Sequence, residues 1–240
     1  MTIDNKNITI CACSSREFLP KLKLAQAATE LRRAGYEVEI VADLCEMTVE
    51  QPERMAEIAR TIVVGCHARA MKALFESAGA ETASLVDLRA NSVGEALKGL
   101  GIQSEGLLQS DEDLLRQVES FERKVGTDAW YPVLDREKCI SCGKCHDFCL
   151  FGVYSMEDGE VKVAQPLNCK NNCPACARVC PVGAVIFAKH PEAPINGGEA
   201  ATEAEGTTFK IDMNAVYNEA LRERLQHRRA SVLLRKEGKR

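Results

Sequence analysis

The sequence is poor in aromatic residues, which make up 5% of its 240 residues, so the hydrophobic core must consist mainly of Ala, Val, Leu and Ile. No run of roughly 18 apolar residues is present, which excludes a membrane-spanning helix, and the first residues include no apolar segment typical of a signal peptide. The net charge of −4 and the pI of about 5.7 do not favour nucleic acid as a partner. We therefore expect a cytoplasmic protein with neither a membrane span nor a nucleic-acid ligand.

The motifs of common catalytic and nucleotide-binding sites are missing as well. No G-x-G-x-x-G follows a predicted strand and no G-x-x-x-x-G-K-[ST] occurs, so the sequence shows no site for FAD, NAD or a nucleoside triphosphate. The sequence also contains no H-E-x-x-H and no G-x-S-x-G, which are typical of zinc proteases and α/β-hydrolases. These absences leave no recognisable catalytic residue.

Cysteine, in contrast, is abundant, because the chain has 12 of them. In a reducing compartment, thiols at this density indicate metal ligands or redox groups rather than disulfides. Four occur early, at Cys11, Cys13, Cys45 and Cys66, and eight are concentrated between residues 139 and 180. We therefore expect two separate cysteine-bearing regions.

Residues 1–106 are expected to form an α/β domain. Apolar runs rich in β-branched residues predict strands at 8–12, 38–42, 61–65 and 83–88. Between them, apolar residues at helical spacing predict helices, one of which is opened by the capping box of Ser92 and Glu95. Strands and helices that alternate with short connections predict a parallel, doubly wound sheet of the Rossmann or flavodoxin type.

The rest of the chain divides into four segments. Residues 107–127 are expected to form a connecting helix with Ser110 at its N-cap, and residues 128–190 a cysteine-rich α+β domain. Residues 191–210 are small, acidic and turn-rich, which predicts a flexible linker. Residues 211–240 predict a basic amphipathic helix, which either docks a redox partner or folds back onto the acidic remainder of the chain. Binding of this helix to RNA or to an anionic membrane is less in keeping with its short length.

The eight clustered cysteines form a duplicated C-x₂₋₃-C-x₂-C-x₃-C pattern. A [4Fe–4S] cubane needs four thiolates at tetrahedral corners, and three closely spaced cysteines can wrap one loop around three irons. The fourth cysteine is expected to start a short helix that points away, and therefore to ligate the other cluster. The expected ligands are Cys139, Cys142, Cys145 and Cys180 for cluster I, and Cys169, Cys173, Cys176 and Cys149 for cluster II. Two zinc sites are the alternative, but zinc does not explain why the third cysteine and the x₃ spacing occur twice.

This segment resembles the bacterial two-cluster ferredoxins over about residues 128–189. Besides the cysteines, the resemblance is carried by Cys180-Pro-Val-Gly-Ala-Val-Ile and by the hairpin predicted around Asp158-Gly159. The sequence departs from the family at Leu150, where the first repeat usually has Pro, and in the three residues, rather than two, between Cys169 and Cys173. The resemblance implies two [4Fe–4S] clusters and electron transport.

The four early cysteines all occur at the ends of predicted strands. Cys11 and Cys13 end the first strand, Cys45 follows the second and Cys66 ends the third. If the strands lie in the order 2-1-3, their carboxyl ends bring all four thiols to one edge of the sheet, where doubly wound folds bind ligands. Cys66 also opens a predicted helix, whose amide groups favour a thiolate, and His67 is expected to be exposed there.

This placement resembles the N-terminal domain of the A-type subunit of heterodisulfide reductase, over about residues 7–104. The matching motifs are Cys11-Ala-Cys13, Ala42-Asp-Leu-Cys45, Val63-Val-Gly-Cys66-His-Ala-Arg69 and Asp87-Leu-Arg89. In that family the cysteines hold a [4Fe–4S] cluster, so the resemblance implies a third cluster here. The family has Ser-Pro where this chain has His67-Ala68, and the Gly-Gln that usually follows the second-strand cysteine is missing. The residues alone leave zinc, unliganded thiols or redox-active thiols as alternatives for this site. Three arginines are either neighbours of a cluster or solvated side chains: Arg16, Arg69 and Arg89.

These features favour an electron-transfer protein or subunit. Two clusters, or three with the N-terminal site, would relay single electrons to or from a heterodisulfide-reductase-like or other anaerobic redox partner. The alternative is a thiol or disulfide reductase in which the N-terminal cysteines form the substrate site, and a third interpretation is an interaction scaffold whose N-terminal domain holds no metal. A site with all its cysteines bound relays electrons, whereas a free cysteine could attack a disulfide.

Overall fold

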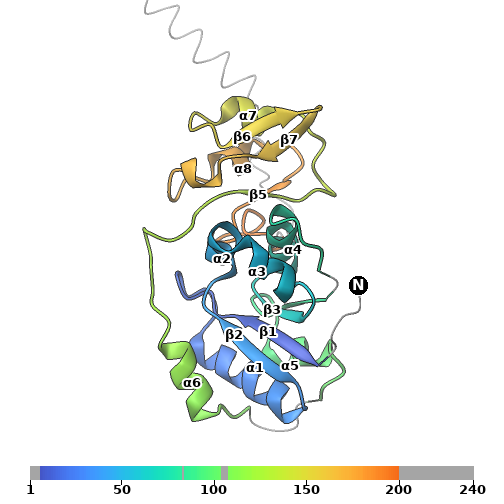
Figure 1. Ribbon diagram of the computed structural model, residues 1–240, viewed down its shortest axis with the longest axis vertical. Coiled ribbons are helices and arrows are strands. Elements are labelled where there is room, and N and C mark those ends of the chain that lie inside the picture. The colour runs from blue at the N-terminus through green and yellow to red at the C-terminus, as the bar shows by residue number, and fades with distance from the viewer. Residues whose placement is uncertain (1–5, 83, 104–107, 200–240) are drawn as a thin grey trace, which may run out of the picture. The chain divides into compact units, whose positions relative to one another are not determined.

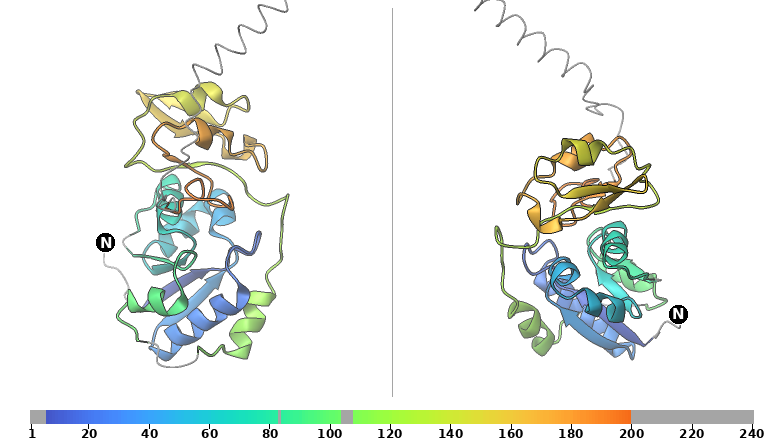
Figure 2. Two further views of the ribbon diagram at one scale, coloured as in Figure 1. Left: turned by 180° about the vertical axis from the view of Figure 1, so that it is seen from behind. Right: turned by 45° about the horizontal axis from the view of Figure 1, so that its top comes forward.

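The computed structural model describes residues 6–82, 84–103 and 108–199 (Figures 1 and 2). The helix predicted at 211–240 and the predicted linker from residue 200 onward lie outside these residues. All described residues belong to one unit of the chain. Among them, no helix is long and apolar enough to cross a membrane.

A four-stranded parallel sheet organises the N-terminal half in the order β2-β1-β3-β4. Its strands are β1 (Asn7–Cys11), β2 (Glu37–Val41), β3 (Ile62–Gly65) and β4 (Leu85–Asp87). Each strand begins and ends within two residues of its predicted bounds. The first three strands have the expected 2-1-3 order. This half is therefore an α/β domain with β1 and β3 at the centre of the sheet.

Helices cover both faces of this sheet, because successive side chains of each strand alternate between the faces. Ile8 and Ile10 of β1 pack with α1 (Lys21–Arg33), α5 (Val93–Lys98) and α6 (Glu112–Glu119). Cys11 of β1 and Val63 of β3 pack on the other side with α2 (Leu44–Glu50), α3 (Pro52–Ile58) and α4 (Ala68–Ser77). The views of Figure 2 show α1 and α6 side by side, away from α2 and α4.

Local sequence explains where several of these helices begin. The predicted capping box of Ser92 and Glu95 is present at the start of α5. The connecting helix is shorter than predicted, because Asp111 rather than Ser110 caps α6 and the helix ends at Glu119. Helix α2 was not predicted, and its start is fixed by Asp43, whose carboxylate accepts hydrogen bonds from the backbone N–H groups of Cys45 and Glu46.

The C-terminal half of the described chain is built from two small antiparallel sheets and two short helices (Figure 1). Strands β5 (Val133–Leu134) and β8 (Val185–Ile186) pair with each other, and β6 (Tyr154–Glu157) pairs with β7 (Glu160–Val163). Helices α7 (Lys144–Phe148) and α8 (Ala175–Val179) flank them, with a 3₁₀ turn at Pro166–Asn168. The predicted hairpin turn is present, with positive φ angles of 51° at Asp158 and 81° at Gly159.

The two halves share a hydrophobic core. Tyr131 and Val133 before and in β5, and Ile186 and Ala188 in and after β8, are buried against α4 and the neighbouring cysteine-bearing strands. In the described part of the predicted linker, residues 196–198 are buried and Gly197 lies against Ala70 of α4, whereas residues 191–194 and 199 are exposed. Composition predicts flexibility there because it does not register these contacts with a distant helix.

Candidate metal centres

The first cysteine site consists of Cys139, Cys142, Cys145 and Cys180. These four residues line one small cavity, about 10 Å³ in volume, together with apolar residues that include Ile140, Val161 and Val185. Cys139 and Cys142 lie on the loop before α7, Cys145 lies in α7, and Cys180 directly follows α8. The structure thus brings together the residues that the spacing assigns to cluster I.

The second cysteine site consists of Cys149, Cys169, Cys173 and Cys176. They line a mainly apolar cavity of about 440 Å³ that also includes Phe148, Leu150 and Phe151. Four thiols around one apolar space suit an iron–sulfur cluster, whose ligands are thiolates and whose potential depends on exclusion of solvent. Among the described residues, no three His, Cys, Asp or Glu side chains are placed to hold a single metal ion.

The short helices explain why each site takes one cysteine from the other loop. Helix α7 carries Cys145 of the first site, and Cys149 of the second site caps its C-terminus. Helix α8 carries Cys176 of the second site, and Cys180 of the first site caps its C-terminus. The fourth cysteine therefore ends a short helix instead of starting one, which corrects the sequence-based expectation.

Hydrogen bonds to sulfur differ between these two sites. In the first site the backbone N–H of Ala184 donates to Cys180 Sγ at 3.2 Å. In the second site the hydroxyl of Tyr154 donates to Cys176 Sγ at 3.1 Å, and both side chains are buried. Burial raises the pKa of the Cys176 thiol to about 12, although the Tyr154 hydrogen bond opposes this. A sulfur so placed carries a stable negative charge when a cation such as iron compensates it.

The N-terminal site consists of Cys11, Cys13, Cys45 and Cys66, all buried with exposures between 4% and 8%. Cys11, Cys45 and Cys66 belong to one hydrophobic cluster, and Cys13 lies at the adjoining strand end. Burial, with a smaller contribution from the neighbouring Cys13, raises the pKa of Cys66 to about 12. The expected helix-start effect does not prevail, because α4 begins two residues later, at Ala68, and burial dominates. Reactive cysteines are accessible and have a lowered pKa, so these thiols do not fit that description.

Charged side chains surround this N-terminal site on the side of β8. Lys189 is 3% exposed, and its Nζ lies 3.0 Å from Asp43 Oδ2 and 3.5 Å from Asp128 Oδ2. Within the described chain, however, no group meets Lys189 Nζ in hydrogen-bonding geometry. Burial lowers the pKa of Lys189, but Cys45 and Asp43 outweigh this effect and raise it. The positive charge of this buried ammonium group close to Cys45 favours an anionic group at the site, such as a thiolate-bound cluster.

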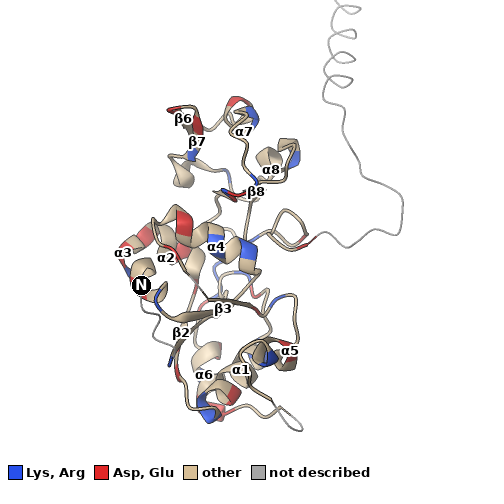
Figure 3. Cartoon of the chain, turned by 90° about the vertical axis from the view of Figure 1, so that its right-hand side faces the viewer, with Lys and Arg blue, Asp and Glu red and all other residues tan. Residues whose placement is uncertain are grey.

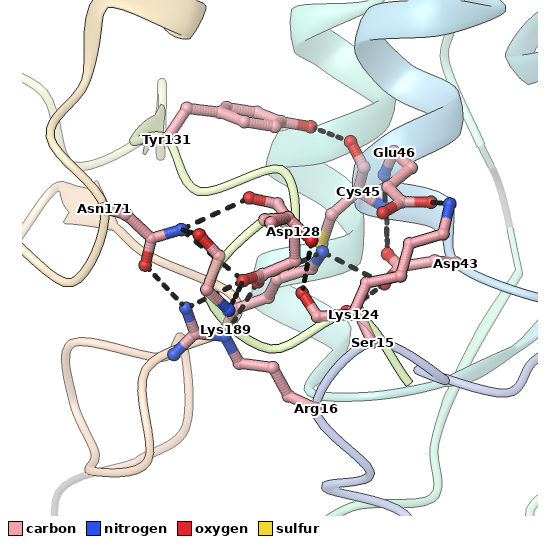
Figure 4. Close-up of polar contacts among 12 residues, drawn as sticks. Ser15, Arg16, Asp43, Cys45, Glu46, Lys124, Asp128, Tyr131, Asn171 and Lys189 are labelled. Carbon is pink, nitrogen blue, oxygen red and sulfur yellow. Dashed lines mark hydrogen bonds and ion pairs between the residues drawn. The ribbon is translucent and has the colours of Figure 1, made fainter. Parts of the chain in front are cut away.

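A polar network next to Lys189 ties the sheet domain to the loop between Cys169 and Cys173 (Figure 4). Arg16 donates to Asp128 through Nε at 2.7 Å and to Asn171 and Asn172 at 3.1 and 2.8 Å. Burial raises the pKa of Asp128, but the hydrogen bond from Arg16 and the charge of Lys189 outweigh it, so this pKa is lowered. Asp128 is therefore ionised at neutral pH and holds both cations.

The other two arginines singled out in the sequence also bridge the halves of the chain. Arg69 pairs with Asp135, Nε to Oδ2 at 2.6 Å, and donates to the carbonyl of Gly183. Arg89 donates to the carbonyls of Ala188 and His190 at 3.2 and 3.0 Å. They are not solvated side chains. His67 is not exposed either, since it is buried and its Nδ1 lies 3.0 Å from Asp87 Oδ2.

Surface charge on the described chain is mixed in sign. Acidic residues on α2 and α3 lie close to basic residues on α4 in the view of Figure 3. Several of these charges are paired, as in the contact of Lys72 with Glu76, Nζ to Oε1 at 3.8 Å.

Comparison with known proteins places this cysteine geometry in a family. The 4Fe-4S dicluster domain matches residues 121–184. An uncharacterized ferredoxin of Methanocaldococcus jannaschii is 41% identical over 70 residues, which are 29% of this chain and 48% of that protein. Pyruvate synthase subunit PorD of the same organism is 38% identical over 68 residues, 28% of this chain and 77% of that protein. Ferredoxin-3 of Nostoc sp. is 35% identical over 78 residues, 23% of this chain and 79% of that protein.

The chain belongs to the 4Fe–4S dicluster ferredoxins. It is accordingly an iron–sulfur protein of electron transport that binds [4Fe–4S] clusters. The chain spans about half the length of the first of these relatives, and the family match covers the cysteine-rich half. Sequence reasoning singled out the twelve cysteines but not Tyr154, Trp130 and Lys189, which the structure places beside them. A tyrosine, tryptophan or lysine has no characteristic spacing, so its contact with a distant cysteine leaves no signal in the sequence.

Proposed function

We propose that this ferredoxin is an electron-transfer subunit with three [4Fe–4S] clusters, two in the cysteine-rich half and one at the N-terminal site. The observation that carries the two-cluster part is that two separate spaces are each lined by four cysteines. Cys139, Cys142, Cys145 and Cys180 would hold cluster I, and Cys149, Cys169, Cys173 and Cys176 cluster II. Each bound cluster supplies a centre that accepts and releases one electron.

The third cluster is supported by the N-terminal site itself. Its thiols are buried at the carboxyl edge of β1 and β3 and at the start of α2, and the buried ammonium group of Lys189 adds positive charge close to Cys45. Doubly wound sheets bind ligands at this edge. The resemblance of residues 7–104 to the A-type subunit of heterodisulfide reductase is consistent with this assignment. Burial and the raised thiol pKa values disfavour the alternative, a thiol reductase with Cys66 as nucleophile.

The partner would be a larger oxidoreductase. Two observations support a subunit role: the resemblance to the A-type subunit of heterodisulfide reductase and the similarity to a subunit of pyruvate synthase. The sequence contains neither a flavin motif nor a recognisable catalytic motif, so in this proposal the partner would hold the catalytic centre. The basic segment 211–240 would contribute to docking, by charge attraction to an acidic partner surface.

Iron and acid-labile sulfide per chain, measured on anaerobically purified protein, test this function. We expect about 12 irons for three clusters, whereas about 8 would restrict the function to the dicluster domain. Zinc without sulfide would refute it. Two serine variants then test the exchange of ligands between the loops. Cys180→Ser should disturb paramagnetically shifted signals of the Cys139–Cys145 loop, and Cys149→Ser those of the Cys169–Cys176 loop. The reverse pattern would mean that each loop keeps its own fourth ligand.

A further inference from the structure

Two consecutive aromatic residues lie between the N-terminal site and the second cysteine site. Trp130 and Tyr131 are 6% and 7% exposed. The Tyr131 hydroxyl donates to the carbonyl oxygen of Cys45 at 2.6 Å. The Trp130 indole N–H donates to the carbonyl oxygen of Cys173 at 3.4 Å. One covalent dipeptide thus makes a hydrogen bond to a cysteine of each site.

The surroundings of this dipeptide are closely packed. The Trp130 ring stacks on Phe187, with 5.2 Å between ring centroids, and the Arg16 guanidinium lies over the Trp130 ring, 4.6 Å from its centroid. Arg16 also anchors Asn171 and Asn172, which belong to the loop between Cys169 and Cys173. Cys169 packs against the hydrophobic cluster of Cys11, Cys45 and Cys66 as well as against the core of the ferredoxin half. Cysteines of the second site and of the N-terminal site therefore take part in one common hydrophobic cluster.

The first cysteine site is connected to the sheet domain in a different way. Its connection runs through Arg69, a partly exposed side chain that pairs with Asp135 and donates to the carbonyl of Gly183. Neither partner is a cysteine, and no aromatic ring takes part in these contacts. Among the described contacts, the hydrogen bonds of Trp130 and Tyr131 reach a cysteine of the second site and a cysteine of the N-terminal site, whereas those of Arg69 reach no cysteine.

We propose that electrons pass directly between the N-terminal site and the second cysteine site, and that Trp130 and Tyr131 form the connection. The order of the relay is then N-terminal site, second site, first site. One electron leaves one site and arrives at the next, no bond forms or breaks, and no proton moves. A one-electron carrier protein supplies or removes the electron at the ends of the relay. This inference rests on the proposed function, because it needs a cluster at each site.

Magnetic interaction between reduced clusters tests the order of the sites. In fully reduced protein, the EPR signal of the N-terminal cluster should be broadened by its neighbour. The broadening should persist in Cys142→Ser, which removes a ligand of the first site, and disappear in Cys173→Ser, which removes a ligand of the second. If the broadening persisted in Cys173→Ser and disappeared in Cys142→Ser, the proposed order of the three sites would be overturned. About 8 irons in the unaltered chain would overturn this proposal together with the third cluster, while leaving the two-cluster carrier intact.

Substitutions in the dipeptide test the connection itself. Trp130→Phe keeps an aromatic ring beside Phe187 but removes the hydrogen bond to the carbonyl oxygen of Cys173. Tyr131→Phe removes the hydrogen bond to the carbonyl oxygen of Cys45. After photoreduction of the N-terminal cluster, both variants should transfer the electron to the second site more slowly at unchanged reduction potentials. Tyr36→Phe is the matched control, since Tyr36 packs on the opposite face of the sheet, and its rate should equal that of the unaltered protein. Unchanged rates in both dipeptide variants would show that the electron takes another path.

Discussion

At the residue scale, the hydroxyl group of Tyr154 distinguishes the second cysteine site from the first. Its hydrogen bond to Cys176 Sγ stabilises negative charge on sulfur, and a reduced cluster carries more of that charge than an oxidised one. Tyr154→Phe should therefore lower the reduction potential of the second-site cluster. A hydrogen bond worth roughly 1 kcal/mol corresponds to about 40 mV for one electron. An EPR-monitored redox titration measures this shift.

The first-site cluster serves as an internal control in that titration. Its hydrogen bond comes from the backbone of Ala184, which the substitution leaves in place. Its potential should stay constant while that of the second-site cluster falls. Equal shifts at both sites would mean that Tyr154 acts through the fold as a whole instead of through its hydroxyl.

At the element scale, Asp128 holds the segment before β5 against the sheet domain. Its side chain is fully buried and pairs with Arg16 and Lys189. Asp128→Asn would remove the carboxylate between these two cations. Because Lys189 keeps Asp43 and Arg16 keeps its two asparagines, the cost should lie below about 3–5 kcal/mol, the cost of a buried charge left without any partner. We expect the midpoint of anaerobic urea unfolding to fall accordingly. Glu112→Gln is the control, because its pair with Arg116 is exposed and is worth about 0.5 kcal/mol. Equal effects of the two substitutions would contradict the interface role of Asp128.

Residues 191–199 provide a second test at this scale. A Cβ added at Gly197 would lie 2.8 Å from the Cβ and 2.9 Å from the backbone nitrogen of Ala70 in α4. Gly35 has the same φ of +89°, but a Cβ there would meet nothing within 4 Å. Gly35→Ala should cost about 1–2 kcal/mol of backbone strain, and Gly197→Ala should cost about 1–3 kcal/mol more because of the clash. Thermal unfolding measures the difference, and equal losses would show that this segment does not pack on α4.

At the scale of the whole molecule, cluster binding should change the net charge. An oxidised cubane with four thiolates carries about −2, whereas four neutral thiols carry no charge. Three clusters would take the chain from its formal −4 to about −10, and two clusters to about −8. Native electrophoresis of holo- and apoprotein should show faster migration of the holoprotein toward the anode. The mobility of Cys173→Ser should lie between those of the holoprotein and the apoprotein. Identical mobilities of holo- and apoprotein would exclude cluster binding.

Much of the fold was predictable because it depends on short-range patterns. The runs of β-branched residues indicated every strand of the parallel sheet, and Ser92 with Glu95 indicated the start of α5. The spacing of the eight cysteines predicted the two groups that the cavities bring together. In these cases the residues that interact are close in sequence or belong to a repeated unit, so the pattern itself carries the information.

Contacts between distant residues were decided by the tertiary structure alone. Tyr131 meets Cys45 across 86 residues, and Arg16 meets Asp128 across 112. Helix α2 was missed because its seven residues give too short a pattern, although Asp43 caps it. Which lysine is buried, and which aromatic residue reaches a cysteine, depends on how the sheet domain and the ferredoxin half pack. Sequence by itself determined which cysteines group together, whereas packing determined which buried polar and aromatic groups surround them, because burial is a property of the folded chain and not of any local segment.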